Sequence, residues 1–323
     1  MTPELFRELV AEAALSPNVH NIQPTQWRRI DGDTIALIAS PGRTLPVGDP
    51  TGRDAAASHG AAAEGMILAA SLRGIALSLT APAQGEVARL AVTGSTTADP
   101  LAARLTRRRT YRGKFDRRRT DDALAALETF SHPDARLITD RAEIEQIARL
   151  TDQATMRAFR NRPYRTELTS WMRLTPRHPR WSVDGLNAQA MAMSTPVAVA
   201  AGVVMSHPVF EALDAVKLAA PLTGEAATTN TAAALVALVQ DRDAPPFETG
   251  RLWHRLWLEL TARGLAASPL TILGDDPMAA DEMAERLSVP SHRRVVTVLR
   301  AGMVDAARLP APARLSVDEL IVP

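Results

Sequence analysis

Apolar residues recur along this chain in two patterns, one with the 3.6-residue period of a helix and one in the short runs typical of strands. The helical pattern is strongest in residues 54–73 and 249–263. The strand-like runs cover residues 26–30, 34–39, 75–81, 87–93, 135–139, 233–241, 265–273 and 293–302. The DGD sequence between the first two runs is typical of a hairpin turn. These patterns predict an α+β fold.

Three further segments mark the organisation of the chain. Residues 196–205, PVAVAAGVVM, are predicted as another buried strand, and this longest apolar run is far short of the ~20 residues of a spanning helix. Residues 161–184 contain Pro, Arg and Trp and are predicted to be helical at first and then irregular. The break in composition at TGSTTADP divides the chain into predicted units of residues 1–98 and 99–323.

Two helix-to-strand segments resemble each other. GAAAEGMILAASLRGIALS (60–78) and GRLWHRLWLELTARGLAAS (250–268) share a first Gly, a ninth Leu and an Arg-Gly pair before the strand. Chance similarity between two helices rich in Ala and Leu is one interpretation. The other is an internal duplication whose copies pack around a pseudo-twofold axis, so that a site between them would draw on both halves.

Composition excludes several classes of chemistry. The chain has no cysteine, so disulfides, iron–sulfur clusters and thiol nucleophiles are absent. Seven scattered histidines show no metal-binding spacing, and no metal site is predicted. Neither a GxSxG, a GxxxxGK[ST] nor a GxGxxG motif occurs. The net charge of +1 and the lack of a signal-peptide pattern predict a cytoplasmic protein that binds neither nucleic acid nor membrane.

Two segments retain candidate chemistry. The loop SPNVHNIQPTQW (16–27) is either a simple helix-ending loop or a hydrogen-bonding site for a heteroaromatic edge, because Asn both donates and accepts. The basic run RRRTYRGKFDRRR (107–119) is a solvated surface, a nucleic-acid contact or a phosphate site, because guanidinium groups bind oxyanions in a bidentate manner. In this run Arg108, Arg109 and Arg112 flank Thr110, just before a strand-like Lys-Phe pair and a helix that Thr120 is expected to cap.

Together, RRTYR (108–112) and PNVHNIQPTQW (17–27) resemble two motifs of the FMN-dependent nitroreductase superfamily. In most members the arginine motif precedes the loop, whereas here the loop comes first. That order is similar to the twin-domain, Acg-type branch, in which two tandem nitroreductase-like halves form an intramolecular pseudo-dimer. The phrases LPVGDPTGRD (45–54), RTELTSWMR (165–173) and TGRLWHRLWLELTARGLAASPL (249–270) fit the same branch, so the resemblance covers nearly the whole chain.

The resemblance implies one FMN site made from four segments. The phosphate and ribityl chain would contact Arg108, Arg109, Thr110, Arg112 and Arg314. The isoalloxazine ring would face Pro17, Asn18, Val19 and Asn21 from the other half, with Asn187 also near the ring. Pro269, Leu270, Thr271 and Ile272 would lie against the flavin, with backbone N–H groups near N5.

Several positions depart from the family pattern. The family loop usually has Ser where Asn18 and Val19 stand, and Thr271 stands where many members have Glu. The first half lacks an Arg-Arg-Thr motif before its loop, so one FMN per chain is expected. Residues 161–184 would form a lid over the flavin.

The resulting functional hypothesis is an FMN-dependent oxidoreductase that transfers hydride from NAD(P)H to a small-molecule electron acceptor such as a nitroaromatic or a quinone. No side-chain acid or base is assigned. The alternative is a protein of the same fold that stores or sequesters FMN with little turnover. Because the expected dimer is internal, the chain is predicted to be a monomer.

Overall fold

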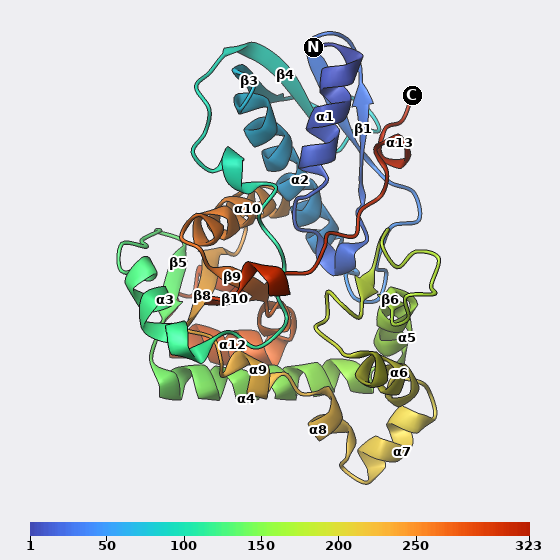
Figure 1. Cartoon of the computed structure of the whole chain (residues 1–323), viewed down its shortest axis with the longest axis vertical. Helices are drawn as coiled ribbons and strands as arrows, with labels where there is room; N and C mark the ends of the chain where they lie inside the picture. The colour runs from blue at the N-terminus through green and yellow to red at the C-terminus, as the bar shows by residue number, and fades with distance from the viewer.

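The computed structural model describes all 323 residues and contains helices and two four-stranded antiparallel sheets (Figure 1). The first sheet has the strand order β1-β2-β4-β3. Its strands are β1 (Thr25–Arg29), β2 (Thr34–Ala39), β3 (Ile75–Thr80) and β4 (Ala88–Ser95). The predicted hairpin is confirmed, since Thr25 of β1 pairs with Ala39 of β2.

Helices α1 (Pro3–Ala13) and α2 (Arg53–Ser71) pack on the first sheet. Thr2 caps α1 and Pro3 occupies its first turn, where a missing N–H costs nothing. Leu9 of α1, Met66 of α2 and Leu37 of β2 belong to one buried apolar core. This core therefore joins two helices to one face of the sheet.

The second sheet has the order β5-β8-β10-β9. Its strands are β5 (Ala135–Ile138), β8 (Ala234–Asp241), β9 (Ala266–Pro269) and β10 (Arg293–Gly302). Helices cover both of its faces: α3 (Thr120–Leu127) and α10 (Pro246–Ala262) on one, and α4 (Arg141–Arg160), α11 (Ile272–Asp275) and α12 (Pro277–Arg286) on the other. Leu235 and Val239 of β8 pack in one core, and Val236 and Leu238 pack in the other. Burial on both faces explains the unbroken apolar run of β8.

Helices α2 and α10 form a close junction between the two sheet units. A Cβ added at Gly60 of α2 would overlap the carbonyl oxygen of Phe247, and one added at Gly250 of α10 would overlap that of Ala57. Each glycine thus faces the residue three positions before the other. His254 Nδ1 also pairs with the Ala61 carbonyl oxygen at 2.8 Å. The helix backbones approach so closely only because both positions lack a side chain.

The C-terminal segment returns to the first sheet, as the red ribbon beside β1 in Figure 1 shows. Ile321 forms a parallel bridge with Trp27, and Leu320 of α13 (Val317–Leu320) lies in the first core. Thr110 forms a parallel bridge with Ala267 of β9 in the second sheet. The end of the chain thus packs on the first sheet, and the segment that follows the first sheet packs on the second.

The predicted buried strand at residues 196–205 is wrong, because this run forms α6 (Thr195–Val204) with only Ala198 buried. Both edges of β8 are paired, one with β5 and the other with β10, so no further strand can lie beside β8. Pro196 occupies the first turn of α6, as suits a helix start. Val199 and Val203 are more than half exposed. Hydrophobicity alone predicted a buried strand here, but the run pairs with no strand of either sheet.

Three smaller predictions also differ from the structure. The run 265–273 leaves the sheet after Pro269 and enters α11. Thr120 is the first residue of α3 and not its cap, because Asp116 caps the preceding turn at Arg117–Arg119. The Lys114-Phe115 pair is not a strand.

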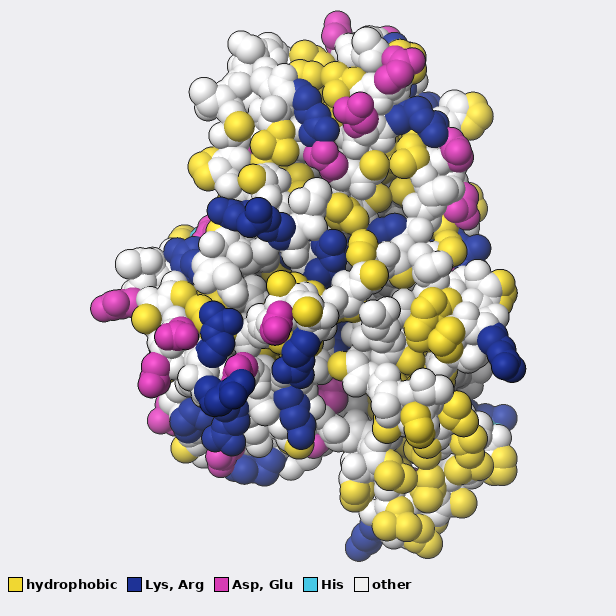
Figure 2. Space-filling model, viewed as in Figure 1, with side chains coloured by type: hydrophobic (Ala, Val, Ile, Leu, Met, Phe, Trp, Pro, Cys, Tyr) yellow, Lys and Arg dark blue, Asp and Glu magenta, His cyan; other side chains and the backbone are white.

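Residues 161–230 form an appendage that extends from α4, at the lower right of Figure 1. It contains α5 (Arg162–Ser170), β6 (Met172–Arg173), β7 (Leu186–Asn187), α6, α7 (Val209–Ala215), α8 (Ala219–Thr223) and α9 (Ala226–Thr229). Figure 2 shows apolar side chains gathered on the surface over α6–α8. No single helix of the chain has the length and apolarity to cross a membrane, although α6 and α7, bent by 83°, pass that test as a pair.

Candidate functional site

A cavity of about 360 Å³ lies beside the junction of α2 and α10. This volume is within the roughly 300–1,000 Å³ of small-molecule sites. The cavity is lined by all of the site residues predicted from the sequence except Asn187: Pro17, Asn18, Val19, Asn21, Arg108, Arg109, Thr110, Arg112, Pro269, Leu270, Thr271, Ile272 and Arg314. The fold therefore brings together segments from the beginning, the middle and the end of the chain.

Asn187 is placed differently. Its side chain is buried, its Nδ2 donates to the Trp181 carbonyl oxygen at 2.9 Å, and its Oδ1 accepts from the Ala190 N–H at 2.7 Å. Both ends of the amide are thus used inside the appendage. Asn187 shapes the loop that carries Ala190 and Met191, which do line the cavity.

The loop after α1 is held by its own amide side chains. Asn18 Oδ1 accepts from the Gln23 N–H at 2.9 Å, and Asn21 Nδ2 donates to the carbonyl oxygens of Gly185 and Ala313, each at 3.1 Å. His20, Asn21 and Gln23 have positive φ angles, which are uncommon for residues other than Gly. The side-chain amides, predicted as ligand contacts, are largely used to hold this strained loop against the cavity.

Four guanidinium groups from the predicted site line the cavity, and none of them forms an ion pair with a carboxylate. Arg108, Arg109, Arg112 and Arg314 donate only to backbone carbonyl oxygens and to the Asn21 amide oxygen. Arg108 is 3% exposed, and its Nε and Nη1 have no hydrogen-bond partner. Buried charge without a partner is costly, so this end of the cavity is built for an anion.

The surroundings of these arginines lower their pKa values. Burial lowers the pKa of Arg108 well below its usual range, and the charges of Arg314 and Arg109 lower it further. Burial and the charge of Arg109 lower the pKa of Arg314 to about 10. A bound anion would reverse both effects, because an opposite charge favours the protonated guanidinium.

An apolar wall adjoins the arginines. Trp253 and Trp257 of α10 meet edge to face with ring centroids 5.6 Å apart, and the Arg108 guanidinium lies 4.6 Å from the centroid of the Trp257 ring. Leu238, Leu270 and Val296 of the second sheet unit add aliphatic surface. A ligand with an anionic end and a flat apolar body matches this combination.

The segment after β9 offers backbone donors to the cavity. The Leu270 N–H donates to the Val298 carbonyl oxygen at 2.7 Å and is therefore used. The N–H groups of Thr271 and Ile272 have no acceptor within the protein, and they stand at the start of α11. Such groups at the beginning of a helix are available to a ligand.

Two features of the cavity wall were not predicted from the sequence. His20 is neutral near pH 7, because burial and the charge of Arg112 lower its pKa to about 4. Asp54 of α2 and Asp275 of α11 form an acidic end, together with Arg53, Arg294 and Tyr164. Asp54 lies in the phrase LPVGDPTGRD, and that phrase is the sequence signal that could have identified this end of the cavity.

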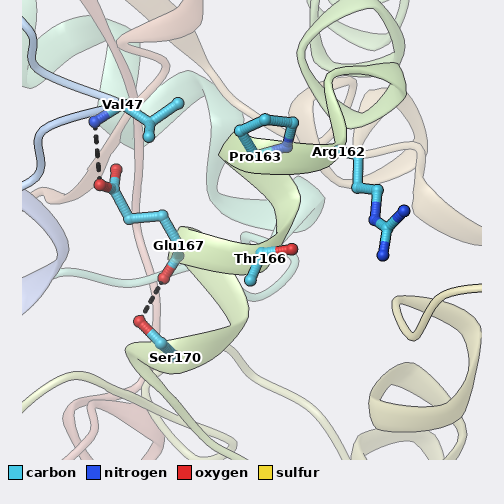
Figure 3. A pocket seen from close by; sticks show the side chains of 6 residues that line it. All are labelled: Val47, Arg162, Pro163, Thr166, Glu167 and Ser170. Atoms are coloured by element: carbon cyan, nitrogen blue, oxygen red, sulfur yellow. Dashed lines mark hydrogen bonds between the residues drawn. The ribbon is translucent and has the colours of Figure 1, made fainter.

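A second, shallower pocket of about 420 Å³ lies outside this site (Figure 3). Its Glu167 carboxylate on α5 accepts the N–H groups of Val47 at 2.9 Å and Gly48 at 2.7 Å. The only carboxylate of the pocket is thus already bonded within the protein. Its role is to fasten α5 to the loop that precedes α2. No group of three or more His, Asp or Glu side chains in the protein is arranged to hold a metal ion.

No protein-family model matches the chain, and no curated protein does. Among solved structures, it is similar to the FMN- and NADPH-dependent nitroreductase NfnB from Sphigopyxis sp. strain HMH, with 18% identity, a TM-score of 0.36 and coverage of 69% of this chain and 98% of that one. It is also similar to NfnB from Mycobacterium smegmatis in complex with NADPH, with 17% identity, a TM-score of 0.34 and coverage of 69% of this chain and 93% of that one. A third similar structure is iodotyrosine deiodinase bound to FMN and 3-iodo-L-tyrosine, with 17% identity, a TM-score of 0.35 and coverage of 66% of this chain and 92% of that one.

Proposed function

We propose that the protein binds FMN in the cavity beside α2 and α10 and acts as an NAD(P)H-dependent oxidoreductase. The observation that carries the proposal is the group of four cavity arginines without a carboxylate partner, beside an apolar wall. Arg108, Arg109 and Arg112 lie in the motif that resembles one of the FMN-dependent nitroreductase superfamily. Arg314 is implied by the same resemblance. Geometry and motif thus point to one ligand with a phosphate group and a flat ring system.

The residues present fit FMN. Arg108 keeps two buried nitrogens without a partner, and phosphate oxygens accept such donors. Arg109 and Arg314 add charge at the same end, since their charges act on Arg108 and on each other. Trp253, Trp257 and the aliphatic side chains beside them suit an isoalloxazine ring.

When bound, FMN supplies the redox chemistry, accepting hydride from NAD(P)H and reducing an acceptor such as a nitroaromatic or a quinone. The chain's own contribution is to hold and orient. The N–H groups of Thr271 and Ile272 are free to donate to a ring atom, and His20 presents a neutral imidazole. Tyr164 and Leu168 of α5 line the cavity from the appendage.

We infer that the chain has two tandem nitroreductase-like halves, residues 1–98 and 99–323, which form an internal pseudo-dimer and leave the chain a monomer. The reciprocal packing of Gly60 and Gly250 supports this, because a twofold axis makes such contacts in pairs. The two units also share a connection. In the first, α2 joins β2 to the edge strand β3, which pairs with β4; in the second, α10 joins β8 to the edge strand β9, which pairs with β10. Gly74 and Gly264 both follow the junction helices with positive φ.

One FMN per chain is part of the proposal. On the far side of the α2–α10 junction, the Glu64 carboxylate pairs with Arg251 at 2.9 Å and with Arg255 at 2.8 Å. Asp99 also pairs with Arg255 at 2.8 Å. The charges on that side are neutralised within the protein, so no anion is needed there.

The alternative is FMN storage with little turnover, for which residues 161–184 would act as a lid. Tyr164 and Leu168 of this segment line the cavity, and Glu167 fastens it to the loop 45–50. The appendage would then limit access of NAD(P)H. The two functions share the cavity and differ only in whether a second molecule reaches it.

The first experiment measures FMN uptake by the purified chain, from its visible spectrum and from quenching of FMN fluorescence. Arg108→Gln should weaken FMN binding about 100-fold, since the loss of a charged hydrogen-bonding partner costs about 1.5–3 kcal/mol or more when buried. The matched control is Arg118→Gln in the same basic run, whose side chain is 90% exposed. A wild-type chain that takes up no FMN, and instead binds DNA or RNA in a salt-dependent manner, would contradict the proposal.

The second experiment separates turnover from storage. The FMN-loaded protein is mixed anaerobically with NADPH or NADH, and the flavin absorption band is followed. Bleaching supports the oxidoreductase. A band that stays oxidised with both nucleotides but is bleached by dithionite supports storage.

A further inference from the structure

Asp54 places a carboxyl group without a partner on the wall of the cavity. It belongs to the phrase LPVGDPTGRD and to the first turn of α2. Its side-chain oxygens form no hydrogen bond or ion pair within the protein, whereas Asp49 accepts the Ala55 N–H at 2.8 Å and Asp275 pairs with Arg53 at 2.9 Å. Asp54 is thus the one carboxyl of this group that is free to meet a ligand.

The groups around Asp54 come from four elements. The charged and titratable groups that face it are Arg53 of its own helix, Asp49 of the preceding loop, Asp275 of α11, Arg294 of β10 and Tyr164 of α5. Three carboxyl groups therefore share two guanidinium groups, and one negative charge is left without compensation. Protonation of one of the carboxyl groups removes that excess.

The environment of Asp54 favours the neutral carboxyl. Burial and then the charges of Asp275 and Asp49 raise the pKa of Asp54 to about 7, against the opposing charges of Arg53 and Arg294. Burial raises the pKa of Asp275 as well, against the effect of Arg53. Tyr164 stays a neutral phenol, because burial and these carboxylates raise its pKa to about 12.

The acidic end adjoins the segment that is expected to lie against the reacting ring. Asp275 interacts with the Thr271 side chain, and Thr271 and Ile272 carry the free N–H groups that face the same cavity. Arg108, Arg109 and Arg314 also line this cavity, and none of them pairs with Asp54 or Asp275; the charges that lower the pKa of Arg108 are those of Arg314 and Arg109. The buried, unpartnered nitrogens of Arg108 independently indicate that the cavity holds a ligand.

We propose that Asp54 is the proton donor to the small molecule reduced in this cavity, with Asp275 as the neighbouring residue whose negative charge keeps that proton on Asp54. The inference rests on the proposed oxidoreductase function. The acceptor gains two electrons and one hydrogen that originate in NAD(P)H, which becomes NAD(P)⁺. The O–H bond of Asp54 breaks, its proton forms a new O–H or N–H bond on the acceptor, and the carboxylate takes a proton back from water.

The first readout needs no activity. With ¹³C-labelled aspartate, the Asp54 carboxyl resonance of the purified protein should titrate near neutral pH, and the signal should be missing in Asp54→Asn. In Asp275→Asn the midpoint of Asp54 should move to lower pH, because a neighbouring negative charge is gone. A midpoint near the ordinary value of about 4 in the wild type would overturn the inference.

The second readout uses the FMN-loaded protein with a quinone as the acceptor. Asp54→Asn should bind FMN within twofold of the wild type and be reduced by NADPH at an unchanged rate. Its rate of quinone reduction should fall about 100-fold, the usual scale of a lost general acid. The wild-type rate should decline as the pH rises through about 7, and this decline should be absent from the variant. Asp54→Glu should restore part of the rate.

The matched control is Asp243→Asn, which removes an exposed carboxyl shortly before α10, outside the cavity. It should leave FMN binding, the rate and the pH profile unchanged. If Asp54→Asn reduces the quinone at the wild-type rate with the same pH profile, the inference is wrong while the proposed function stands. A wild-type chain that takes up no FMN, or whose FMN is not reduced by NADPH, overturns both, and these steps are read before any variant is compared.

Discussion

The two sides of the α2–α10 junction treat their charges in opposite ways. On one side Glu64, 3% exposed at its side chain, binds Arg251 and Arg255, and the positive charge is neutralised within the protein. On the cavity side Arg108 and its three neighbours have no carboxylate partner. Similar side chains thus form ion pairs within the protein on one side and keep free donors on the other, as the proposed FMN site requires. The absence of ion pairs to these arginines, and not the number of arginines, therefore distinguishes the candidate site.

The largest expected effect is on the junction itself. Gly60→Ala should lower the free energy of unfolding by about 3 kcal/mol or more, because its Cβ would overlap the Phe247 backbone, which cannot move aside as a side chain can. Gly32→Ala is the control, since nothing lies within 4 Å of a Cβ there. Denaturant unfolding of both variants measures the difference. Equal stability of the two would show that the helices do not meet so closely.

The next effect concerns the neutralised side. Glu64→Gln should destabilise the protein by about 2 kcal/mol, because two guanidinium groups lose the same buried carboxylate; their own partial exposure reduces the cost. FMN binding should stay unchanged. Glu248→Gln removes an exposed partner of Arg251 and should cost less than about 0.5 kcal/mol. A loss of FMN binding in Glu64→Gln would contradict the separation of the two sides.

The cavity side should respond in the opposite direction. Arg108→Met should raise the stability of the ligand-free protein by about 1–2 kcal/mol, because it replaces a buried guanidinium that has two unpartnered nitrogens by an unbranched apolar side chain. FMN should no longer stabilise this variant. Arg118→Met, at an exposed position, should change neither quantity. A marked loss of ligand-free stability in Arg108→Met would mean that Arg108 serves the fold and not a ligand.

The smallest effect is the pH dependence from Asp54. Its pKa is raised in the folded protein, so the folded state binds more protons and loses stability as the pH rises from about 4 through about 7. Asp54→Asn should therefore be more stable than the wild type at pH 8, by on the order of 1 kcal/mol, and equal to it near pH 4. Thermal unfolding at both pH values measures this. A difference at pH 4 as large as at pH 8 would contradict the assignment.

The sequence predicts the strands that are paired on both sides better than it predicts the apolar runs that lie elsewhere. The β8 run is a buried strand because β5 and β10 pair with it and helices cover both faces. The run 196–205 is also strongly apolar but forms α6 on the surface and pairs with no strand. Local hydrophobicity does not reveal which edges of a sheet are already paired.

The same limit applies to the candidate site. Arg108 and the loop 16–27 were identified because their motifs are local in sequence. Asp54 and Asp275 come from α2 and α11, and no sequence motif contains both of them. Their proximity therefore follows only from the fold. Asn187 has the right residue type, but its amide is bonded inside the appendage.

The central claim is that the cavity arginines bind the phosphate of FMN, and a comparison of FMN with riboflavin, which lacks the phosphate, tests it most directly. Isothermal titration should show that the wild-type chain binds FMN at least about 100-fold more tightly than riboflavin, since charged hydrogen bonds contribute about 1.5–3 kcal/mol each. Arg108→Gln should lose most of this preference while riboflavin affinity changes little. Equal affinity of the wild type for the two flavins, or an undiminished preference in Arg108→Gln, would contradict the account.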